Sequence, residues 1–153
     1  AALREAAKAI DDRVRDKAPH PKITGFLAQP MAKGVAEAIL GFRRDPEIGP
    51  IVLLGAGGIT AELWRDVTLS CAPVSVEEAR AMIGRVKGLQ VAAGWRGLPK
   101  GDLEALAAAV AAFSRLAARE DVAEAEINPL IIGREGEGVF VADAWVVRPG
   151  AAH

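Results

Sequence analysis

Apolar side chains recur at two different spacings along the chain, and together these spacings predict both helices and strands. In residues 3–16 they recur at intervals of three and four positions, which marks one face of an α-helix. Residues 102–118 repeat this pattern behind Asp102, a residue type that is typical of a helix N-cap. Ser75 and Glu78 have the spacing of a capping box, which predicts a third helix directly behind it.

Short apolar runs bounded by Gly and Pro predict the strands. Residues 23–29 and 36–43 are separated by a short segment with Pro and Gly, and we expect them to pair as a hairpin. Residues 51–54 are wholly apolar, which suits a buried strand, and residues 67–72 predict another strand. Residues 88–101 are rich in Gly and predict a loop.

The last two predicted strands, residues 123–132 and 139–147, flank a turn of Gly and charged residues. If this hairpin is symmetric about its turn, Asn128 lies opposite Asp143. Helices and strands alternate along the chain, but most of the strands are expected to pair in hairpins. We therefore predict an α+β fold, with a largely antiparallel sheet backed by helices.

The same hairpin carries the strongest candidate chemistry. Glu126 lies two residues before Asn128, so both side chains are expected on the face that also carries Asp143. That face would also carry a set of apolar side chains: Leu130, Ile132, Val139, Val141 and Trp145. Two carboxylates and an amide suit Mg²⁺, which completes its coordination shell with water and substrate phosphates. The alternative is structural, with Asn128 ending a strand and Asp143 capping a turn. A shift of one residue would separate the two side chains.

A second candidate is the glycine-rich turn behind the apolar run, in which Gly57 and Gly58 would let backbone N–H groups approach a phosphate. The spacing matches neither a P-loop nor a dinucleotide-binding loop, and a tight turn is the alternative. Glu62 and Asp66 would repel a phosphate unless a cation lay between them. We assign Gly57 and Gly58 as the candidate phosphate loop.

Composition narrows the class of protein. The 19 basic and 20 acidic side chains argue against a nucleic-acid partner. Cys71 is the only cysteine; it excludes an intramolecular disulfide, favours a reducing compartment and is expected to pack as a small apolar residue. The longest uncharged stretch, residues 48–61, is too short to span a membrane, which takes about 20 apolar residues. We expect a cytoplasmic protein with no nucleic-acid or membrane partner.

Several short motifs stand in an order that resembles a known family. They are Gln29-Pro30-Met31, Glu37-Ala-Ile-Leu-Gly-Phe-Arg-Arg-Asp-Pro46, Gly55-x-Gly-Gly58, Ala72-Pro73, Gly94-Trp-Arg-Gly97, Glu126-Ile-Asn-Pro-Leu130 and Asp143-Ala144. In this order they resemble the ATP-grasp region of NDP-forming acyl-CoA synthetases, which include ADP-forming acetyl-CoA synthetase. These enzymes are related to the β subunit of succinyl-CoA synthetase. The resemblance covers residues 23–147.

The resemblance implies roles for several residues, with Mg²⁺ and ATP or ADP as cofactors. Asn128 and Asp143 would hold the Mg²⁺. Glu126 would be catalytic, because it would contact a phosphorylated His that carries the phosphoryl group. Glu37 would lie near the nucleotide. Three residues would meet the adenine: Gln29, Pro30 and Met31.

The resemblance also implies a reaction, in which acid, CoA and ATP are converted reversibly to acyl-CoA, ADP and phosphate. CoA and the carboxylic acid would bind through other domains of a larger parent, and its oligomeric state is left open. The chain begins at Ala1 without a Met and lacks the first ATP-grasp lobe. We therefore expect a single partial ATP-grasp domain over residues 1–153, in which a helix and loop (1–22) precede the family-like region (23–147). Alone it is expected to be inactive.

Two positions depart from the family pattern, since Ser70 and Trp145 stand where relatives often carry Arg. Fewer cations near a triphosphate predict weaker nucleotide binding. This favours an alternative function, a non-catalytic regulatory or assembly module of a fused protein. A third interpretation is a structural subunit whose polar hairpin face is an interface.

Overall fold

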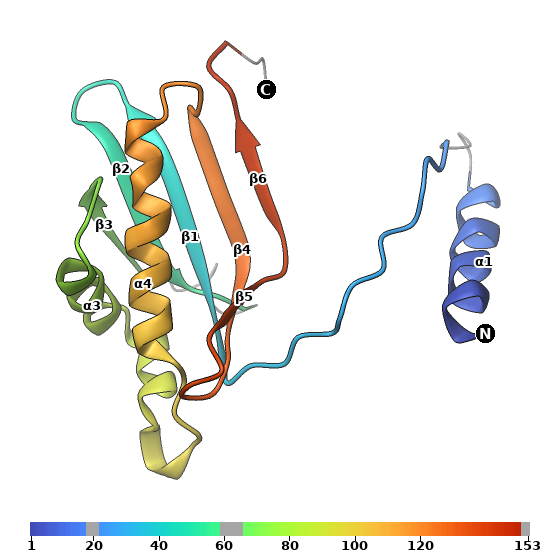
Figure 1. Cartoon of the computed structure of the whole chain (residues 1–153), viewed down its shortest axis with the longest axis horizontal. Coiled ribbons are helices and arrows are strands. Elements are labelled where there is room, and N and C mark those ends of the chain that lie inside the picture. Colours follow the sequence, from blue (N-terminus) through green and yellow to red (C-terminus); the bar gives the residue numbers. More distant parts are fainter. Residues whose placement is uncertain (18–21, 59–65, 151–153) are drawn as a thin grey trace. The chain divides into compact units, whose positions relative to one another are not determined.

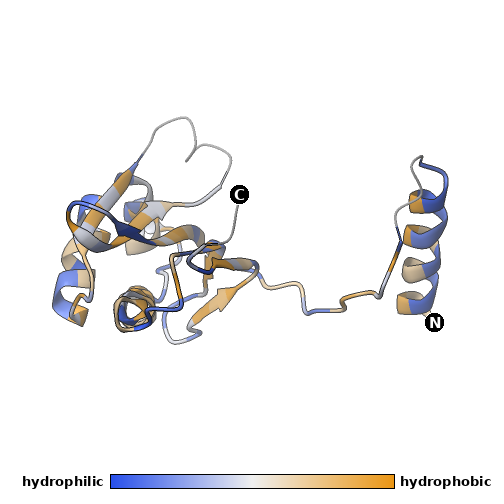
Figure 2. Ribbon diagram, turned by 90° about the horizontal axis from the view of Figure 1, so that it is seen from above, coloured by the Kyte–Doolittle hydropathy of each residue, from blue (hydrophilic) through white to orange (hydrophobic). Residues whose placement is uncertain are grey.

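The computed structural model describes residues 1–17, 22–58 and 66–150, which fall into two units, Ala1–Met31 and Ala32–His153. Glu62, one of the two acidic residues noted behind the glycine turn, lies outside the described residues. The first unit contains helix α1 (Ala2–Arg15), so the helix predicted over 3–16 is confirmed. Figure 2 shows that apolar residues gather on one side of this helix and polar residues on the other. None of its side chains is buried.

Residues 22–34 form no strand, so the predicted strand over 23–29 and its hairpin with 36–43 are wrong. The physical reason is the lack of a pairing partner. An extended segment becomes a strand only when a neighbour satisfies its backbone groups, and the strands that the structure describes pair only with one another.

The second unit is built on one antiparallel sheet, in the order β3-β2-β1-β4-β5, with β6 also paired to β4 (Figure 1). Its strands are β1 (Ala36–Asp45), β2 (Gly49–Ala56), β3 (Val67–Cys71), β4 (Glu124–Ile132), β5 (Val139–Val141) and β6 (Ala144–Val147). The predicted strands from residue 36 onward are confirmed, although the last one is divided into β5 and β6.

Helices cover one face of this sheet (Figure 1). The helical elements are α3 (Val76–Arg85), η1 (Lys87–Ala93), η2 (Trp95–Gly97), α4 (Leu103–Ser114) and η3 (Arg115–Ala118). The predicted capping box is present at α3, where the Glu78 N–H donates to Ser75 Oγ at 3.1 Å and the Ser75 N–H donates to Glu78 Oε2 at 2.7 Å. The predicted loop over 88–101 instead contains the short 3₁₀ turns η1 and η2.

The core lies between the sheet and these helices, which confirms the α+β class. It contains fully buried side chains from both layers, among them Leu40, Leu54, Met82, Leu106 and Leu130. None of the described helices of the second unit covers the opposite face, which we call the open face. Among the described helices, none is both long and apolar enough to cross a membrane.

Arg44 ties the end of β1 to the helical layer. Its guanidinium donates to the carbonyl oxygens of Ala117 and Arg119, both at 2.9 Å, and its Nε donates to the carbonyl of Val122 at 3.0 Å. The carbonyls at the end of a helix have no partner within the helix, so a cation placed there satisfies them and interacts favourably with the helix dipole. Arg44 performs this role from a strand, which brings the cation from a distant part of the sequence.

Replacing Arg44 with Met is expected to destabilise the second unit by about 2 kcal/mol. The substitution keeps the apolar stem and removes charged donors from the partly buried carbonyls of Ala117 and Val122. Urea denaturation measures the change. The matched control is Arg43→Met. Arg43 is exposed, and its ion pair among the described residues is with the nearby Asp45 at 2.9 Å, so its loss should change stability little. Equal effects of the two substitutions would contradict the role of Arg44.

Asp102 confirms the predicted N-cap of α4, since its Oδ1 accepts the Ala105 N–H at 2.9 Å. Its other oxygen accepts N–H groups of the β4–β5 turn, from Gly138 at 2.9 Å and Gly136 at 3.1 Å. These bonds favour the carboxylate and lower the pKa of Asp102, with the bond from Ala105 contributing most. One side chain therefore holds a helix and a hairpin turn together.

The lowered pKa of Asp102 predicts a pH-dependent contribution to stability. The contribution is complete above the ordinary aspartate pKa of about 3.9 and is lost as the pH falls through the lower folded value. Asp102→Asn should lower the melting temperature at about pH 7, and this difference should shrink at about pH 2. Thermal melts at both pH values measure it. Glu120→Gln, an exposed acid-to-amide control, should show no such dependence.

Candidate active site

The predicted register of the last hairpin is confirmed. Four pairs across β4, β5 and β6 all belong to it: Ile132–Val139, Leu130–Val141, Ile127–Ala144 and Glu126–Trp145. Asn128 lies directly opposite Asp143, and its N–H donates to the Asp143 carbonyl at 3.1 Å. The two residues on which the site depends are therefore neighbours across the hairpin.

A β-bulge at Asn128 and Pro129 changes which side chains share a face. The register of β4 against β1 shifts there, so that two residues of β4 stand opposite Ile39 alone. Before the bulge, Glu126 lies on the open face, opposite Gly41 of β1. After it, the alternation is reversed. Leu130 and Ile132 therefore point into the helix-covered core, and the prediction that they share a face with Glu126 is wrong.

Glu126, Asn128 and Asp143 form the candidate site at this bulge. Asn128 Nδ2 donates to Glu126 Oε1 at 3.2 Å, which links the amide to the first carboxylate. Asp143 Oδ1 accepts the N–H of Ala144 at 2.8 Å, which restrains the second carboxylate. Asn128 and Asp143 are exposed and Glu126 is half-buried, so a ligand can reach all three.

The electrostatics of this site favour a cation. Among the described residues, no cationic side chain lies within ion-pair distance of Glu126 or Asp143. The described part of the chain also has no cluster of three His, Cys, Asp or Glu side chains that would enclose a metal. An Asn–Asp pair instead leaves most of a coordination shell open. That arrangement suits Mg²⁺, which keeps several waters and binds substrate phosphates.

The candidate phosphate loop lies beside Glu37 near the start of β1, two residues along that strand from Ile39, which faces the bulge. The Gly57 N–H donates to the Glu37 carbonyl at 2.7 Å. A Cβ on Gly57 would lie 2.7 Å from Glu37 Cβ, so only glycine allows this approach. Gly58 has a φ of +89°, which also favours glycine. Glu37 pairs with Ile131 of β4, so the loop and the hairpin site belong to one continuous sheet.

The predicted adenine-binding residues Gln29, Pro30 and Met31 are exposed and have no regular secondary structure. They belong to the first unit, whereas the hairpin and the glycine turn belong to the second. Contact between these three residues and an adenine therefore stays a prediction.

Sequence reasoning missed a hollow of about 310 Å³ on the open face. Gly41, Leu53 and Leu69 contribute to its lining, with Glu126 and the partly exposed ring of Trp145 among its other residues. The available signal was Gly41 in the middle of a strand, because an interior glycine weakens a strand and often marks a close approach. The hollow extends the open face from Glu126 toward β3.

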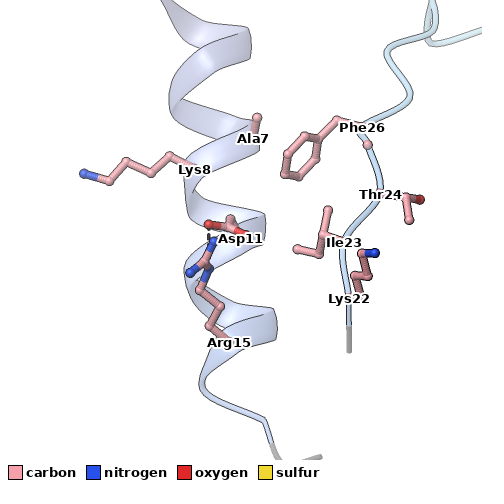
Figure 3. A pocket seen from close by; sticks show the side chains of 9 residues that line it. Ala7, Lys8, Asp11, Arg15, Lys22, Ile23, Thr24 and Phe26 are labelled. Atoms are coloured by element: carbon pink, nitrogen blue, oxygen red, sulfur yellow. Dashed lines mark hydrogen bonds and ion pairs between the residues drawn. The ribbon is translucent and has the colours of Figure 1, made fainter. Parts of the chain in front are cut away.

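The first unit contains a separate groove between α1 and residues 22–26 (Figure 3). Its volume is about 890 Å³, and side chains of Lys8, Asp11 and Phe26 line it. Arg15 Nε donates to Asp11 Oδ2 at 2.8 Å along the helix side of this groove. None of these residues was singled out from the sequence.

The two departures from the family pattern lie on different faces of the sheet. Ser70 pairs with the buried Val52 and shares its helix-covered face, whereas Trp145 is on the open face opposite Glu126. Only Trp145 therefore alters the surface that carries the candidate site.

Cys71 is exposed, so its predicted packing is wrong. β3 is an edge strand, and none of the described helices of the second unit covers the open face beside Cys71.

Comparisons with known proteins show the family and the fold of the chain. A family model described as "ATP-grasp domain" matches residues 1–147. The β subunit of ADP-forming acetate–CoA ligase II from Pyrococcus furiosus is 33% identical over 150 residues, which are 97% of this chain and 64% of that protein. An ADP-forming 4-hydroxybutyrate–CoA ligase from Nitrosopumilus maritimus is 32% identical over 147 residues, which are 95% of this chain and 21% of that protein.

Solved structures show the same relationship. Acetyl-coenzyme A synthetase 1 from Candidatus Korarchaeum cryptofilum, in complex with coenzyme A, acetyl-coenzyme A and a phosphorylated phosphohistidine segment, has a TM-score of 0.85 and 36% identity. The match covers 95% of this chain and 65% of that one. The same protein with coenzyme A and Mg-AMPPCP has a TM-score of 0.71 and 37% identity, over 76% of this chain and 55% of that one.

This chain belongs to the ATP-grasp family. The family match includes α1, which lies before the region where we recognised the motifs. The chain spans about two thirds of the length of the Pyrococcus relative and a smaller share of the Nitrosopumilus one.

Gly57→Ala is expected to destabilise the second unit by about 1–3 kcal/mol, because the new methyl group would overlap Glu37 and force the glycine turn away from β1. Gly84→Ala is the matched control. Nothing lies within 4 Å of a Cβ at Gly84 in helix α3, so that substitution should stabilise by up to about 1 kcal/mol. Chemical denaturation measures both, and a neutral Gly57→Ala would disprove the close contact.

Proposed function

We propose that this chain is the Mg²⁺- and nucleotide-binding part of an ADP-forming acyl-CoA synthetase. The observation that carries the proposal is the adjacency of Asn128 and Asp143 across the hairpin, next to the half-buried carboxylate of Glu126. The named ligases among its relatives and the Mg-AMPPCP complex of a structural neighbour support it. The residues themselves fit the metal, since they supply oxygen ligands, uncompensated negative charge and open positions.

Asn128 and Asp143 would hold the ion, which when bound neutralises the charge of the nucleotide phosphates. Phosphoryl transfer depends mainly on positioning and on charge stabilisation. The bulge supplies the positioning, because backbone bonds fix both residues at one point of the sheet. Gly57 and Gly58 would form the phosphate loop. The Gly57 N–H is bonded to the Glu37 carbonyl, so Gly57 would hold the turn against β1 and Gly58 would present its N–H to the phosphates. Glu37 would border the nucleotide from β1.

Glu126 would orient the group that accepts the phosphoryl. One of its oxygens accepts the Asn128 amide, and the other can accept an N–H from an imidazole brought in by another part of the enzyme. The γ-phosphoryl then passes from ATP to the free imidazole nitrogen and leaves ADP, and the phosphohistidine later donates it to the carboxylic acid. A structural neighbour that contains a phosphohistidine segment pointing toward its nucleotide site supports this role.

CoA and the carboxylic acid would bind through other domains of the parent enzyme, as the CoA complexes of structural neighbours and the subunit names of relatives suggest. Gln29, Pro30 and Met31 would meet the adenine once the ATP-grasp site is complete. We propose that the protein is cytoplasmic and that it is active only as part of the complete enzyme. We also propose that residues 1–153 form a single partial ATP-grasp domain.

Trp145 favours a second candidate, a non-catalytic regulatory or assembly module that binds nucleotide. It places an uncharged ring opposite Glu126, where a cation would assist a phosphorylated group. Nucleotide binding without ligase turnover in the longest natural form of the protein would support this candidate.

The proposed site predicts Mg²⁺-dependent binding of ADP by the 153-residue chain. Asn128→Ala and Asp143→Asn should each weaken this binding at least tenfold, because each removes an oxygen ligand or a charge from the site. Isothermal titration with and without Mg²⁺ measures the effect.

Asp16→Ala is the control for the titration, because it removes an exposed carboxylate at the end of α1. It should leave the affinity unchanged. Affinity that is equal in all variants, or independent of Mg²⁺, would refute the site assignment. Unchanged circular dichroism would show that the variants remain folded.

A further inference from the structure

A hollow of about 510 Å³ lies at the opposite end of α4 from Arg44, among segments that the proposed function does not use. Three parts of the second unit line it: the segment just before β1, η1 together with the loop after η2, and the turn between β4 and β5. Figure 1 shows this turn at the base of α4, beside the loop that contains η1 and η2. Val35, Val91 and Leu98 supply apolar lining, and Lys33 and Arg134 supply positive charge.

Backbone hydrogen bonds join these three walls into one frame. The Val35 N–H donates to the Ile132 carbonyl at 2.8 Å, and the Gly101 N–H donates to the Ala92 carbonyl at 2.8 Å. The Glu135 N–H donates to the Lys100 carbonyl at 3.0 Å. Asp102 holds the same turn through its bonds to Gly136 and Gly138. The hollow is therefore preformed, and little order has to be imposed when a ligand binds.

The loop that forms one wall has an unusual backbone. Gly94, Arg96 and Gly97 all have positive φ angles, of +91°, +52° and +83°. A positive φ is uncommon for a residue other than glycine, and such conformations gather at binding sites. Trp95 in this loop is 61% exposed, and the guanidinium carbon of Arg96 lies 6.0 Å from its ring centre.

The charges around the hollow are not balanced by ion pairs. Within the described residues, neither the Lys33 ammonium nor the Arg134 guanidinium has a carboxylate within 4.0 Å. The one lining carboxylate, Glu137, accepts the Arg134 backbone N–H at 2.9 Å through Oε2. Lys100 and Arg96 add positive charge on the adjoining loop. Cations beside an apolar floor suit an anion that has an apolar or ring-shaped body.

We propose that this hollow is a second ligand site, which binds an organic phosphate of about the size of a nucleoside diphosphate. The phosphate groups contact Lys33 and Arg134, and the ring or apolar part covers Val91 and Leu98. CoA and ADP share this chemistry, and the experiment distinguishes them. The site stands independently of the hairpin, and only the choice of these two probes rests on the proposed function.

The test is a titration of the ¹⁵N-labelled 153-residue chain with CoA and, separately, with ADP, followed by amide NMR spectra. EDTA is present, so that Mg²⁺-dependent binding at Asn128 and Asp143 makes no contribution. Saturable shifts should be confined to amides in residues 33–35, 91–101 and 134–138. Stronger binding of CoA identifies a CoA site and stronger binding of ADP a nucleotide site, and either result supports the proposal.

The double variant Lys33→Gln/Arg134→Gln keeps much of the side-chain stems and should weaken binding at least tenfold. The matched control Arg85→Gln/Lys87→Gln removes the same charge from exposed positions outside the hollow, and its affinity should stay within twofold of the unmodified chain. Spectra that superpose outside the three segments show that each variant is folded. If the double variant perturbs the fold, Arg134→Gln alone provides the comparison and should still weaken binding severalfold.

Absence of saturable binding by both probes would overturn the proposal, as would equal affinity of the double variant and its control. Asn128→Ala/Asp143→Asn should bind at the hollow like the unmodified chain. If the proposed function is wrong, the unmodified chain will show no Mg²⁺-dependent binding of ADP, and binding at the hollow in EDTA will be unaffected. The two failures are therefore distinguishable.

Discussion

The pairing of β1 with β2 on one side and with β4 on the other is the constraint on which the second unit depends. The central strand β1 buries the side chains of Ala38, Leu40 and Phe42. A slip of one residue in its pairing would turn these side chains away from the helices. Burial therefore determines the register, and the register places Gly57 beside Glu37 and Glu126 beside Gly41. β1 therefore positions the residues of the candidate site, although Glu37 is the only one of the predicted site residues that it contains.

The bulge in β4 separates structural and chemical roles along a single strand. Leu130 and Ile132 pack into the core, whereas Glu126 and Asn128 remain accessible to a ligand. A regular strand would have placed all four on one face, and burying the apolar pair would then have buried the polar pair as well. An unpaired buried carboxylate is costly, so the reversal at Asn128 and Pro129 allows a stable core and a charged site to coexist.

Side chains also join elements that the sequence presents as separate. Arg44 connects a strand to the end of η3, and Asp102 connects the start of α4 to the β4–β5 turn. Arg44 holds the segment that leads into β4 against the end of β1. Asp102 supports the turn that carries Arg134, on one side of the hollow beside Lys33. Arg44 and Asp102 both bind backbone groups of the partner element. Every residue has such groups, so the sequence of the partner element does not predict the contact.

Local patterns determined the helices, the capping box, the hairpin register and the position of Asn128 opposite Asp143. All of these depend on neighbours in sequence or on one symmetric turn. Tertiary structure decided the rest. It left residues 23–29 without a strand partner, exposed Cys71 on an edge strand and formed the bulge that reverses β4. It also assembled the two hollows described above, those beside Glu126 and beside Arg134, from distant segments. These features depend on which strands meet, and spacing along one chain does not specify that.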